Sequence, residues 1–409
     1  MRRDIPLLFS TRIIRLFCYG FLSVVLALYL AQVGLSEKTI GLLFTLTLAG
    51  DAGVTLWLTT SADRFGRRRT LIIGALLMAG AGLVFILTRN PLLLMAAAII
   101  GVISPSGNEI GPFLSVEQAG LTELIPAAQR TQVFAWYNLS GSFATATGAL
   151  AGGWLAQFLQ GAGMTSVDAY RTVLMGYALG GTLLAVIFLF VSTAIEVPVG
   201  ARQKLSKPSL GLHRSKGVVL RLSALFAMDA FAGGFVLQSM VAYWFNVRFG
   251  IQAGLIGSIF FGANILAGIS ALLAVPLSKK IGLINTMVFT HIPSSMLLIL
   301  VPIMPNLPLA IIVLLARFSI SQMDVPTRQS YTLAVVAADE RSAASGVTSI
   351  ARSVGAAISP TLTGVFLSIP GFLSAPFFLA GGLKIAYDLL LYRSFRRLKP
   401  PEEQAVKSP

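Results

Sequence analysis

The stretch SADRFGRRRT, residues 61–70, lies between two apolar runs, GVTLWLTT at 53–60 and LIIGALLMAGAGLVFILT at 71–88. It carries one aspartate and four arginines in ten positions. Ionised groups are costly inside a bilayer, so these five belong at a water-facing end of the apolar runs. Gly66 allows a turn too tight for a side chain. The stretch therefore predicts a short polar turn between two membrane-spanning helices.

The composition places most of the chain in lipid. Of 409 residues, 55% are hydrophobic and only 11% are charged, and the mean hydropathy is +0.80. A soluble domain carries about a quarter charged residues. The net charge of +15 comes from basic residues between apolar runs, which indicates membrane topology and no nucleic-acid partner. One cysteine and two separated histidines predict no metal site and no cofactor, and argue against a membrane enzyme.

Runs of roughly 20 apolar residues predict helices, because backbone groups in lipid must bond internally. We expect an all-α membrane protein with twelve spans, near 12–33, 39–60, 70–88, 91–115, 132–156, 171–193, 218–246, 251–276, 283–304, 307–331, 342–368 and 371–393. Basic residues crowd into one set of loops, whereas the alternate loops hold only Lys38, Arg89, Arg171 and Arg248. This imbalance predicts that both termini are cytoplasmic. We expect a multi-pass protein of a bacterial-type inner membrane.

The two halves of the chain repeat each other. Gly20 and Gly234 are 214 positions apart by subtraction, and Glu117 and Arg328 are 211 apart. We predict a helical bundle at 1–193, a cytoplasmic linker at 194–217, a second bundle at 218–393 and a cytoplasmic tail at 394–409. Repeated halves are typical of transporters, whose substrate site lies near the membrane midplane where the halves meet.

The loop after the second span resembles the signature loop of the major facilitator superfamily. Ala62, Asp63, Arg64, Gly66, Arg67 and Arg68 match its pattern, and the decayed copy PLSKKIGL keeps Gly282 and two lysines. A partial match to an exporter motif is GALAGG at 148–153, with Ala149 in place of the expected proline. The resemblance covers the whole chain and implies the major facilitator fold, with twelve helices in two pseudo-symmetric six-helix bundles.

The resemblance also implies a function. We expect a monomeric secondary active transporter that moves a small organic solute by alternating access. Proton-coupled efflux, as in the drug/proton antiporter-like branch, is our first hypothesis. Proton-coupled uptake is the alternative, and a non-transporting membrane sensor is a third. The arginine that the family places in the middle of the fourth helix is missing, because VISPSGNEIGPFLSVEQ stands there.

The resemblance gives the signature loop a gating role. It implies that the Asp63 carboxylate bonds the N-terminal end of the eleventh helix, around Arg341 and Ser342. A carboxylate is stabilised at a helix N-terminus. The gating loop would consist of Asp63, Arg64, Gly66 and Arg67. The alternative is a topology anchor without a gate, whose arginines contact anionic headgroups.

Ionisable groups within spans are expensive and usually face a cavity. Here they concentrate on four predicted spans, the first, fourth, seventh and tenth, which in this family line the central cavity. We expect substrate or cavity roles for Arg317, Asp324, Arg328, Asn108 and Tyr243, and proton coupling by Glu109, Asp229 and Glu117.

Each assignment has a structural alternative. Arg15 in the first span would extend to the membrane surface. Glu117 would pair with Arg328 between the halves, or Arg328 with Asp324. Lys384 and Asp388 are four residues apart and would pair along one peripheral helix. Tyr243 would lie in the aromatic belt at the membrane interface.

Overall fold

A computed structural model describes residues 3–126, 129–196, 212–337 and 340–398. Every regular element in these ranges is a helix. Among the described residues, nine helices are long and apolar enough to cross a membrane. The remaining predicted spans, 91–115, 132–156 and 307–331, correspond to a pair of short helices, one 32-residue helix and a second pair of short helices. Most of the predicted linker and tail lie outside the described ranges.

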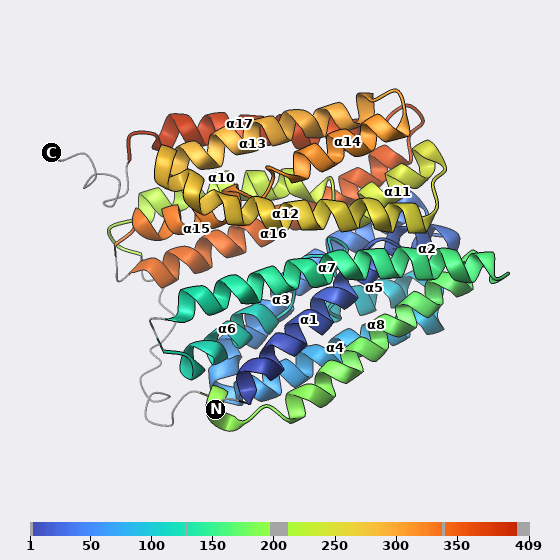
Figure 1. Ribbon diagram of the computed structural model, residues 1–409, viewed down its shortest axis with the longest axis horizontal. Helices are drawn as coiled ribbons and strands as arrows, with labels where there is room; N and C mark the ends of the chain where they lie inside the picture. The colour runs from blue at the N-terminus through green and yellow to red at the C-terminus, as the bar shows by residue number, and fades with distance from the viewer. Residues whose placement is uncertain (1–2, 127–128, 197–211, 338–339, 399–409) are drawn as a thin grey trace. The chain divides into compact units, whose positions relative to one another are not determined.

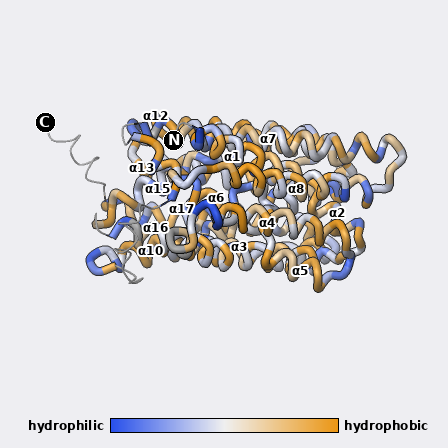
Figure 2. Tube along the Cα trace, turned by 90° about the horizontal axis from the view of Figure 1, so that it is seen from below, coloured by the Kyte–Doolittle hydropathy of each residue, from blue (hydrophilic) through white to orange (hydrophobic). Residues whose placement is uncertain are grey.

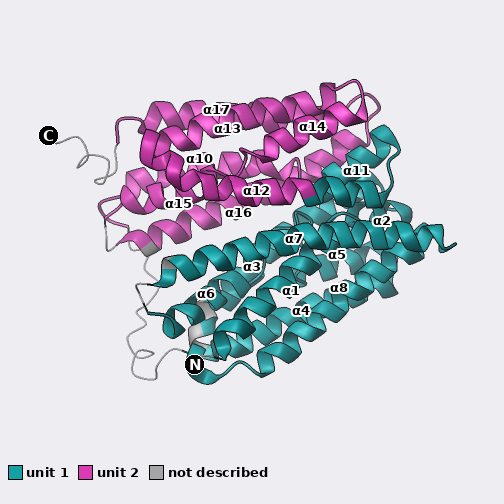
Figure 3. Cartoon of the chain, in the orientation of Figure 1, with its two compact units in different colours: residues 1–206, 237–261 teal, residues 207–236, 262–409 magenta. Residues whose placement is uncertain are grey.

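The chain divides into two compact units, shown in different colours in Figure 3. Unit 1 comprises residues 1–206 and 237–261, and unit 2 comprises 207–236 and 262–409. The described helices of unit 1 (Figure 1) are α1 (Asp4–Ser23), α2 (Leu26–Gln32), α3 (Glu37–Phe65), α4 (Arg67–Leu87), α5 (Pro91–Ile100), α6 (Phe113–Leu124), α7 (Arg130–Gly161), α8 (Ser166–Leu189), η2 (Thr193–Ile195), α11 (Gln238–Phe249) and the start of α12 (Ala253–Ile281).

Unit 2 holds the rest of the described helices. They are α10 (Lys216–Gly234), the later part of α12, α13 (Leu283–Leu300), η3 (Val301–Ile303), α14 (Leu307–Phe318), α15 (Asp324–Ala334), α16 (Arg341–Leu367) and α17 (Ala375–Phe395). The predicted bundle boundaries at 194–217 stay a prediction.

Glycines bring two helix pairs into backbone contact. In unit 1, a Cβ added at Gly148 of α7 would lie 2.0 Å from the Phe17 carbonyl oxygen of α1. In unit 2, a Cβ at Gly355 of α16 would lie 2.3 Å from the Ala227 carbonyl oxygen of α10. Neither position has room for a side chain, so α1–α7 and α10–α16 pack backbone to backbone.

One local contact recurs at the repeat distance. Arg130, at the start of α7, donates from Nη2 to the Thr122 carbonyl at 2.8 Å. Arg341, at the start of α16, donates from Nε to the Leu333 carbonyl at 3.0 Å. The two arginines and the two acceptors are each 211 positions apart (341 − 130 and 333 − 122). Each arginine therefore satisfies a carbonyl near the end of the preceding helix, as a duplicated fold requires.

The outer surface is apolar. Leu87, Leu92 and Phe158 are each more than 70% exposed, and hydrophobic residues predominate along the helices in Figure 2. Monomeric soluble proteins rarely expose large contiguous apolar patches, so acyl chains are the natural solvent of this surface.

Candidate functional site

The predicted fourth span is broken between α5 and α6, and this break positions Glu109. Pro105 and Pro112 remove backbone donors, and Gly107 and Gly111 adopt φ values of 69° and 78°, which favour glycine. The freed backbone groups are bonded by side chains and by backbone elsewhere in unit 1. The Gly111 N–H donates to the Asp51 carboxylate at 2.7 Å, the Tyr177 hydroxyl donates to the Val102 carbonyl, and the Ser239 N–H donates to the Pro105 carbonyl at 3.0 Å. Irregular backbone at membrane depth is tolerated where it is buried in protein.

Unit 1 contains a closed ion-pair network centred on Arg15. The Arg15 guanidinium binds both Glu117 carboxylate oxygens, at 2.9 and 2.7 Å, and its Nε donates to Glu109 at 2.7 Å. Arg15 and Glu117 side chains are fully buried. Thr11 donates to Glu117 at 2.8 Å, and the Tyr137 hydroxyl also donates to Glu117. The fork geometry and the neutral donors stabilise both charges in their buried positions.

Arg12 completes this network, hereafter the unit 1 network, one helical turn before Arg15. Its guanidinium donates to Glu109 at 2.8 Å and to Asn138 at 3.1 Å. It also lies 4.3 Å from the centre of the Tyr137 ring, at cation–π distance. Two arginines therefore face two glutamates, and the network has no net charge.

Unit 2 contains a second network centred on a carboxylate. Asp229 of α10 accepts from Lys384 Nζ at 2.7 Å, from Arg352 at 3.1 Å and from Arg328 at 3.2 Å. Arg328 also donates to Asp324 at 2.8 Å. Asp229 is 4% exposed, so three cations from three different helices compensate its burial.

His291 of α13 extends this network, hereafter the unit 2 network. Its Nδ1 lies 3.0 Å from each carboxylate oxygen of Asp388 on α17. Its Nε2 lies 3.4 Å from Lys384 Nζ and 3.8 Å from Asp229 Oδ1. The expected pair between Lys384 and Asp388 is therefore wrong: Lys384 binds Asp229, and Asp388 binds His291, because α10 and α13 both pack against α17.

The two networks contain the same ion pair with its polarity reversed. Arg15 and Asp229 are 214 positions apart, the spacing of Gly20 and Gly234. Glu117 and Arg328 are 211 apart, the spacing of Arg130 and Arg341. In unit 1 the first span supplies the cation, and in unit 2 its counterpart supplies the anion.

This arrangement corrects the alternative for Arg15, whereas a pair between Glu117 and Arg328 across the halves stays a prediction. Arg15 does not extend to the membrane surface, because its side chain is fully buried and holds two carboxylates. The ion pairs of Glu117 and Arg328 lie within their own units, Glu117 with Arg15, and Arg328 with Asp229 and Asp324. The pairing of Arg328 with Asp324 was among the sequence expectations.

Arg317 lies apart from the unit 2 network. Residues 319–323 interrupt the helix between α14 and α15, so Arg317 and Asp324 do not share one helical face as the spacing predicted. The guanidinium lies 4.8 Å from the centre of the Phe318 ring. Within the described part of the chain, its buried Nε has no hydrogen-bond partner. Arg317 therefore stays a candidate for a substrate contact.

The other predicted cavity residues lie in unit 1. The Asn108 side chain is exposed, in the break beside Glu109. Tyr243 of α11 donates its hydroxyl to Glu37, at the start of α3, at 2.8 Å. A substrate role for either residue stays a prediction.

The signature loop is partly described. Gly66 has φ 104°, in the region that favours glycine, and ends α3. The backbone N–H groups of Arg67 and Arg68 donate to the Glu196 carboxylate at 2.8 and 3.1 Å. The Arg67 guanidinium is buried and donates to the Ile195 carbonyl at 2.9 Å. The side chains of Asp63, Arg64 and Ser342 lie outside the described residues, so the gate stays a prediction.

The sequence reasoning missed Arg12, Tyr137, His291 and Arg352 as network residues. Arg12 carried a signal, because it lies three residues before Arg15 and so on the same helical face. His291 was a second signal, since it is the only histidine within a predicted span. Among the described residues, no group of three acidic, histidine or cysteine side chains is placed to hold a metal ion.

Comparison with known sequences decides the family. The sequence model of the Major Facilitator Superfamily matches residues 8–247 and 222–409. The chain belongs to the major facilitator superfamily. It is also 30% identical over 424 residues to the uncharacterized membrane protein YJR124C of Saccharomyces cerevisiae, covering 95% of this chain and 93% of the yeast protein.

Solved structures of this superfamily share the fold. The nucleoside transporter NupG matches with a TM-score of 0.72 at 12% identity, over 96% of this chain and 99% of NupG. The D-xylose-proton symporter matches with a TM-score of 0.71 at 18% identity, over 95% and 97%. The all-helical, multi-pass fold expected from the sequence is thus confirmed, and the similar solved structures are those of transporters.

Proposed function

We propose that this superfamily member is a proton-coupled secondary transporter that exports a small organic solute by alternating access. The observation that carries the proposal is the pair of buried ion networks, one in each unit. Buried ion pairs contribute little net stability compared with apolar residues of similar volume, and ionisable groups within spans mark ion or substrate pathways. Two such networks in a membrane protein therefore favour a role in transport.

Asp229 and Glu109 are the carboxylates that we assign to proton coupling. Asp229 has three cationic partners, so protonation would release them together. Glu109 lies in a helix break and is 13% exposed as a side chain, whereas Glu117 is fully buried. Glu109 is therefore the more accessible carboxylate of unit 1, and Glu117 is the structural member of that network. One solved structure of similar fold is that of a proton symporter, which supports ion coupling in this fold.

The direction of transport is inferred from one sequence feature. The glycine-rich stretch at 148–153 partly matches an exporter motif, and this favours efflux. Uptake by symport is the alternative. From the basic loops we infer cytoplasmic termini, and we further propose a monomer in a bacterial-type inner membrane. Labelling of each terminus in intact cells tests the sidedness. Because one relative is a yeast protein, the same experiment should also determine in which membrane the protein resides.

The test is flux into proteoliposomes with a pH gradient imposed in either direction. The substrate panel is first narrowed by growth of a deletion strain on candidate compounds. Because an antiporter exchanges the solute for protons, we expect an acidic lumen to accelerate flux into the proteoliposomes. We expect the opposite gradient, with an alkaline lumen, to slow it. Asp229→Asn and Glu109→Gln should lose at least about tenfold of the gradient-driven rate, whereas Glu123→Gln, at a 40% exposed carboxylate, should keep it.

Three outcomes would each contradict one part of the proposal. Wild-type flux that is indifferent to the gradient would exclude proton coupling. Full gradient-driven flux in both Asp229→Asn and Glu109→Gln would exclude these carriers. Acceleration by a gradient of the opposite sign would replace efflux by uptake.

A further inference from the structure

His291 lies in the middle of α13 and is buried. It follows Leu283 by 8 residues and precedes Leu300 by 9 (291 − 283 and 300 − 291). Its side chain is 6% exposed, and that of Asp388 is 1% exposed. A histidine at this depth has both ring nitrogens close to charged groups, Asp388 on one side and Lys384 and Asp229 on the other.

The geometry restricts the proton on the ring. An ionised carboxylate only accepts, so Nδ1, at 3.0 Å from both Asp388 oxygens, carries the proton that it donates. Lys384 has only donors and lies 3.4 Å from Nε2. A proton on Nε2 would point at this ammonium, so the arrangement fits a neutral ring whose Nε2 accepts from Lys384.

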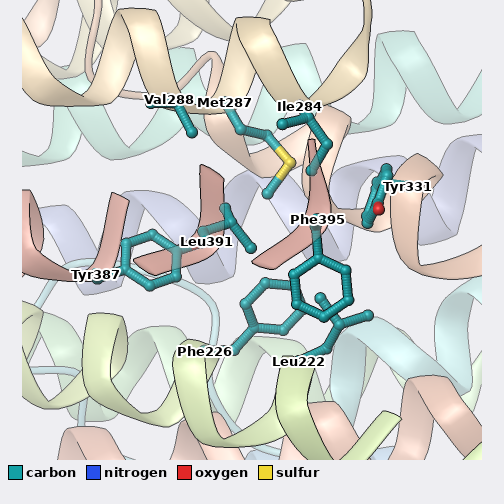
Figure 4. Close-up of a cluster of buried hydrophobic side chains, with 9 residues drawn as sticks. All are labelled: Leu222, Phe226, Ile284, Met287, Val288, Tyr331, Tyr387, Leu391 and Phe395. Carbon is teal, nitrogen blue, oxygen red and sulfur yellow. The ribbon is translucent and has the colours of Figure 1, made fainter. Parts of the chain in front are cut away.

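One side of the site is closed by apolar side chains. The cluster in Figure 4 comprises Leu222, Phe226, Ile284, Met287, Val288, Tyr331, Tyr387, Leu391 and Phe395. On α10 and α13 its members precede Asp229 and His291, and on α15 and α17 they include Tyr331, Leu391 and Phe395, which follow Arg328 and Asp388. Successive spans cross the membrane in opposite directions, so the starts of α10 and α13 and the ends of α15 and α17 lie on the same predicted cytoplasmic side. The cluster therefore lies between the unit 2 network and that side.

We propose that His291 and Asp388 form a proton-binding dyad, and that a proton taken up by His291 exchanges the partner of Asp229 from Lys384 to His291. The inference rests on the proposed function and adds to it a proton-binding side chain next to Asp229. In the exchange, a proton from water bonds to Nε2, and the hydrogen bond from Lys384 to Nε2 is lost. Nε2–H then donates to Asp229 Oδ1, now 3.8 Å away, and the Lys384 ammonium separates from it. Release of the proton to water reverses each step.

The charges around the ring support one added proton. Asp229, Asp324 and Asp388 balance Arg328, Arg352 and Lys384 when His291 is neutral. The groups that contact the ring are Asp229 of α10 and Lys384, Tyr387 and Asp388 of α17. Arg328 and Arg352 lie one contact further away, on Asp229, and Asp324 lies on Arg328. Lys384 is the cation closest to His291, and its departure removes the repulsion that the protonated ring would meet.

The direct test is imidazole NMR on purified protein in detergent micelles. The chain has two histidines, so His213→Gln leaves His291 as the only one, and an affinity tag without histidine keeps the spectrum clean. His213 is exposed and outside the network. In this background we expect an Nδ1–H tautomer at high pH and a doubly protonated ring at lower pH.

Two variants test the partners. Lys384→Met should raise the midpoint of the His291 titration by about 1 pH unit, because the nearest cation is lost, and Asp388→Asn should lower it by a similar amount. Arg221→Met on α10, at an exposed cation outside the network, should leave the midpoint unchanged. An Nε2–H tautomer at high pH, or a midpoint that neither Lys384→Met nor Asp388→Asn moves, would overturn the dyad.

A flux measurement separates this inference from the proposed function. His291→Gln should keep downhill flux and lose acceleration by the pH gradient. Gradient-driven flux in His291→Gln equal to wild type would reject the dyad and leave proton coupling intact. Wild-type flux without gradient dependence would reject the coupling itself, while the NMR titration would still decide whether His291 exchanges protons with Asp388 and Lys384 as neighbours.

Discussion

The two buried networks solve one electrostatic problem in different ways. In unit 1, the Arg15 fork and the hydroxyls of Thr11 and Tyr137 hold Glu117 from several sides, and the pair is fully buried. In unit 2, Asp229 shares three cations, of which Arg352 keeps 34% of its side chain exposed. A group that is held by several rigid partners resists exchange. A group whose partners are flexible and partly exposed can change partners at lower cost.

This difference gives the two duplicated halves different capacities for proton exchange. Reversal of the pair keeps each network neutral but puts a carboxylate at the centre of the unit 2 network and a guanidinium at the centre of the unit 1 network. A guanidinium stays charged at all physiological pH values, whereas a carboxylate and a histidine can take up protons. The centre of unit 2 is therefore suited to proton exchange, whereas the centre of unit 1 is fixed and leaves Glu109, 13% exposed, as the accessible carboxylate of that unit.

The largest effect is expected from Arg15→Ala. It leaves Glu117 buried without its main cation, and removing one partner of a buried pair costs about 3–5 kcal/mol of unfolding free energy. Arg352→Ala in unit 2 should cost about 1 kcal/mol, because Asp229 keeps Lys384 and Arg328 and the lost pair is partly exposed. Thermal unfolding in detergent micelles measures both.

A matched double variant sharpens this comparison. Arg15→Met combined with Glu117→Gln removes the pair together and should be more stable than Arg15→Ala alone. Equal losses for Arg15→Ala and Arg352→Ala would mean that the two networks do not differ in rigidity.

An intermediate effect is expected where the units are alike. Gly148→Ala places a Cβ 2.0 Å from a backbone carbonyl oxygen, and Gly355→Ala places one at 2.3 Å. Backbone must move in both cases, at about 1–3 kcal/mol each. Gly80→Ala within α4, where nothing lies within 4 Å, should be neutral or stabilising. If Gly80→Ala destabilised as much as the other two, close packing would not be the cause.

The smallest effect is expected outside the membrane, at the start of α10. Burial would raise the pKa of the Glu340 carboxyl, but the backbone N–H groups of Arg214, His213 and Ser215 donate to it and lower the pKa from 4.5 to about 2. A lowered pKa stabilises the fold above pH 4.5, and this contribution is lost as the pH falls toward about 2.

Glu340→Gln should therefore lower the melting temperature at pH 7, and the difference from wild type should shrink between pH 4.5 and 2. Melting curves across this range test it. A difference in melting temperature that is constant with pH would show that the negative charge of Glu340 does not contribute to stability. Glu196→Gln tests the corresponding carboxylate of unit 1, which accepts from Arg67 and Arg68.

The sequence predicted the helices better than their contacts. Long apolar runs specify spans wherever they occur, and the repeat offset related Glu117 to Arg328, whereas the relation of Arg15 to Asp229 emerged only from the structure. Partner choice depends on helix packing between residues about a hundred positions apart, such as Arg15 and Glu117, which one sequence does not encode locally. Glu109 and Glu117 share Arg15 through a helix break, and not through the helical face that their spacing suggested.

The glycine contacts between α1 and α7 and between α10 and α16 limit how the protein can move. With no side chains between the two backbones, there is nothing to repack at an intermediate position, so each pair keeps its register or comes apart. Sliding along these seams would bring a side chain to a place where a Cβ has no room. We therefore expect the motions of the proposed transport cycle at the interrupted segments 101–112 and 319–323, which have no continuous helical ladder to break.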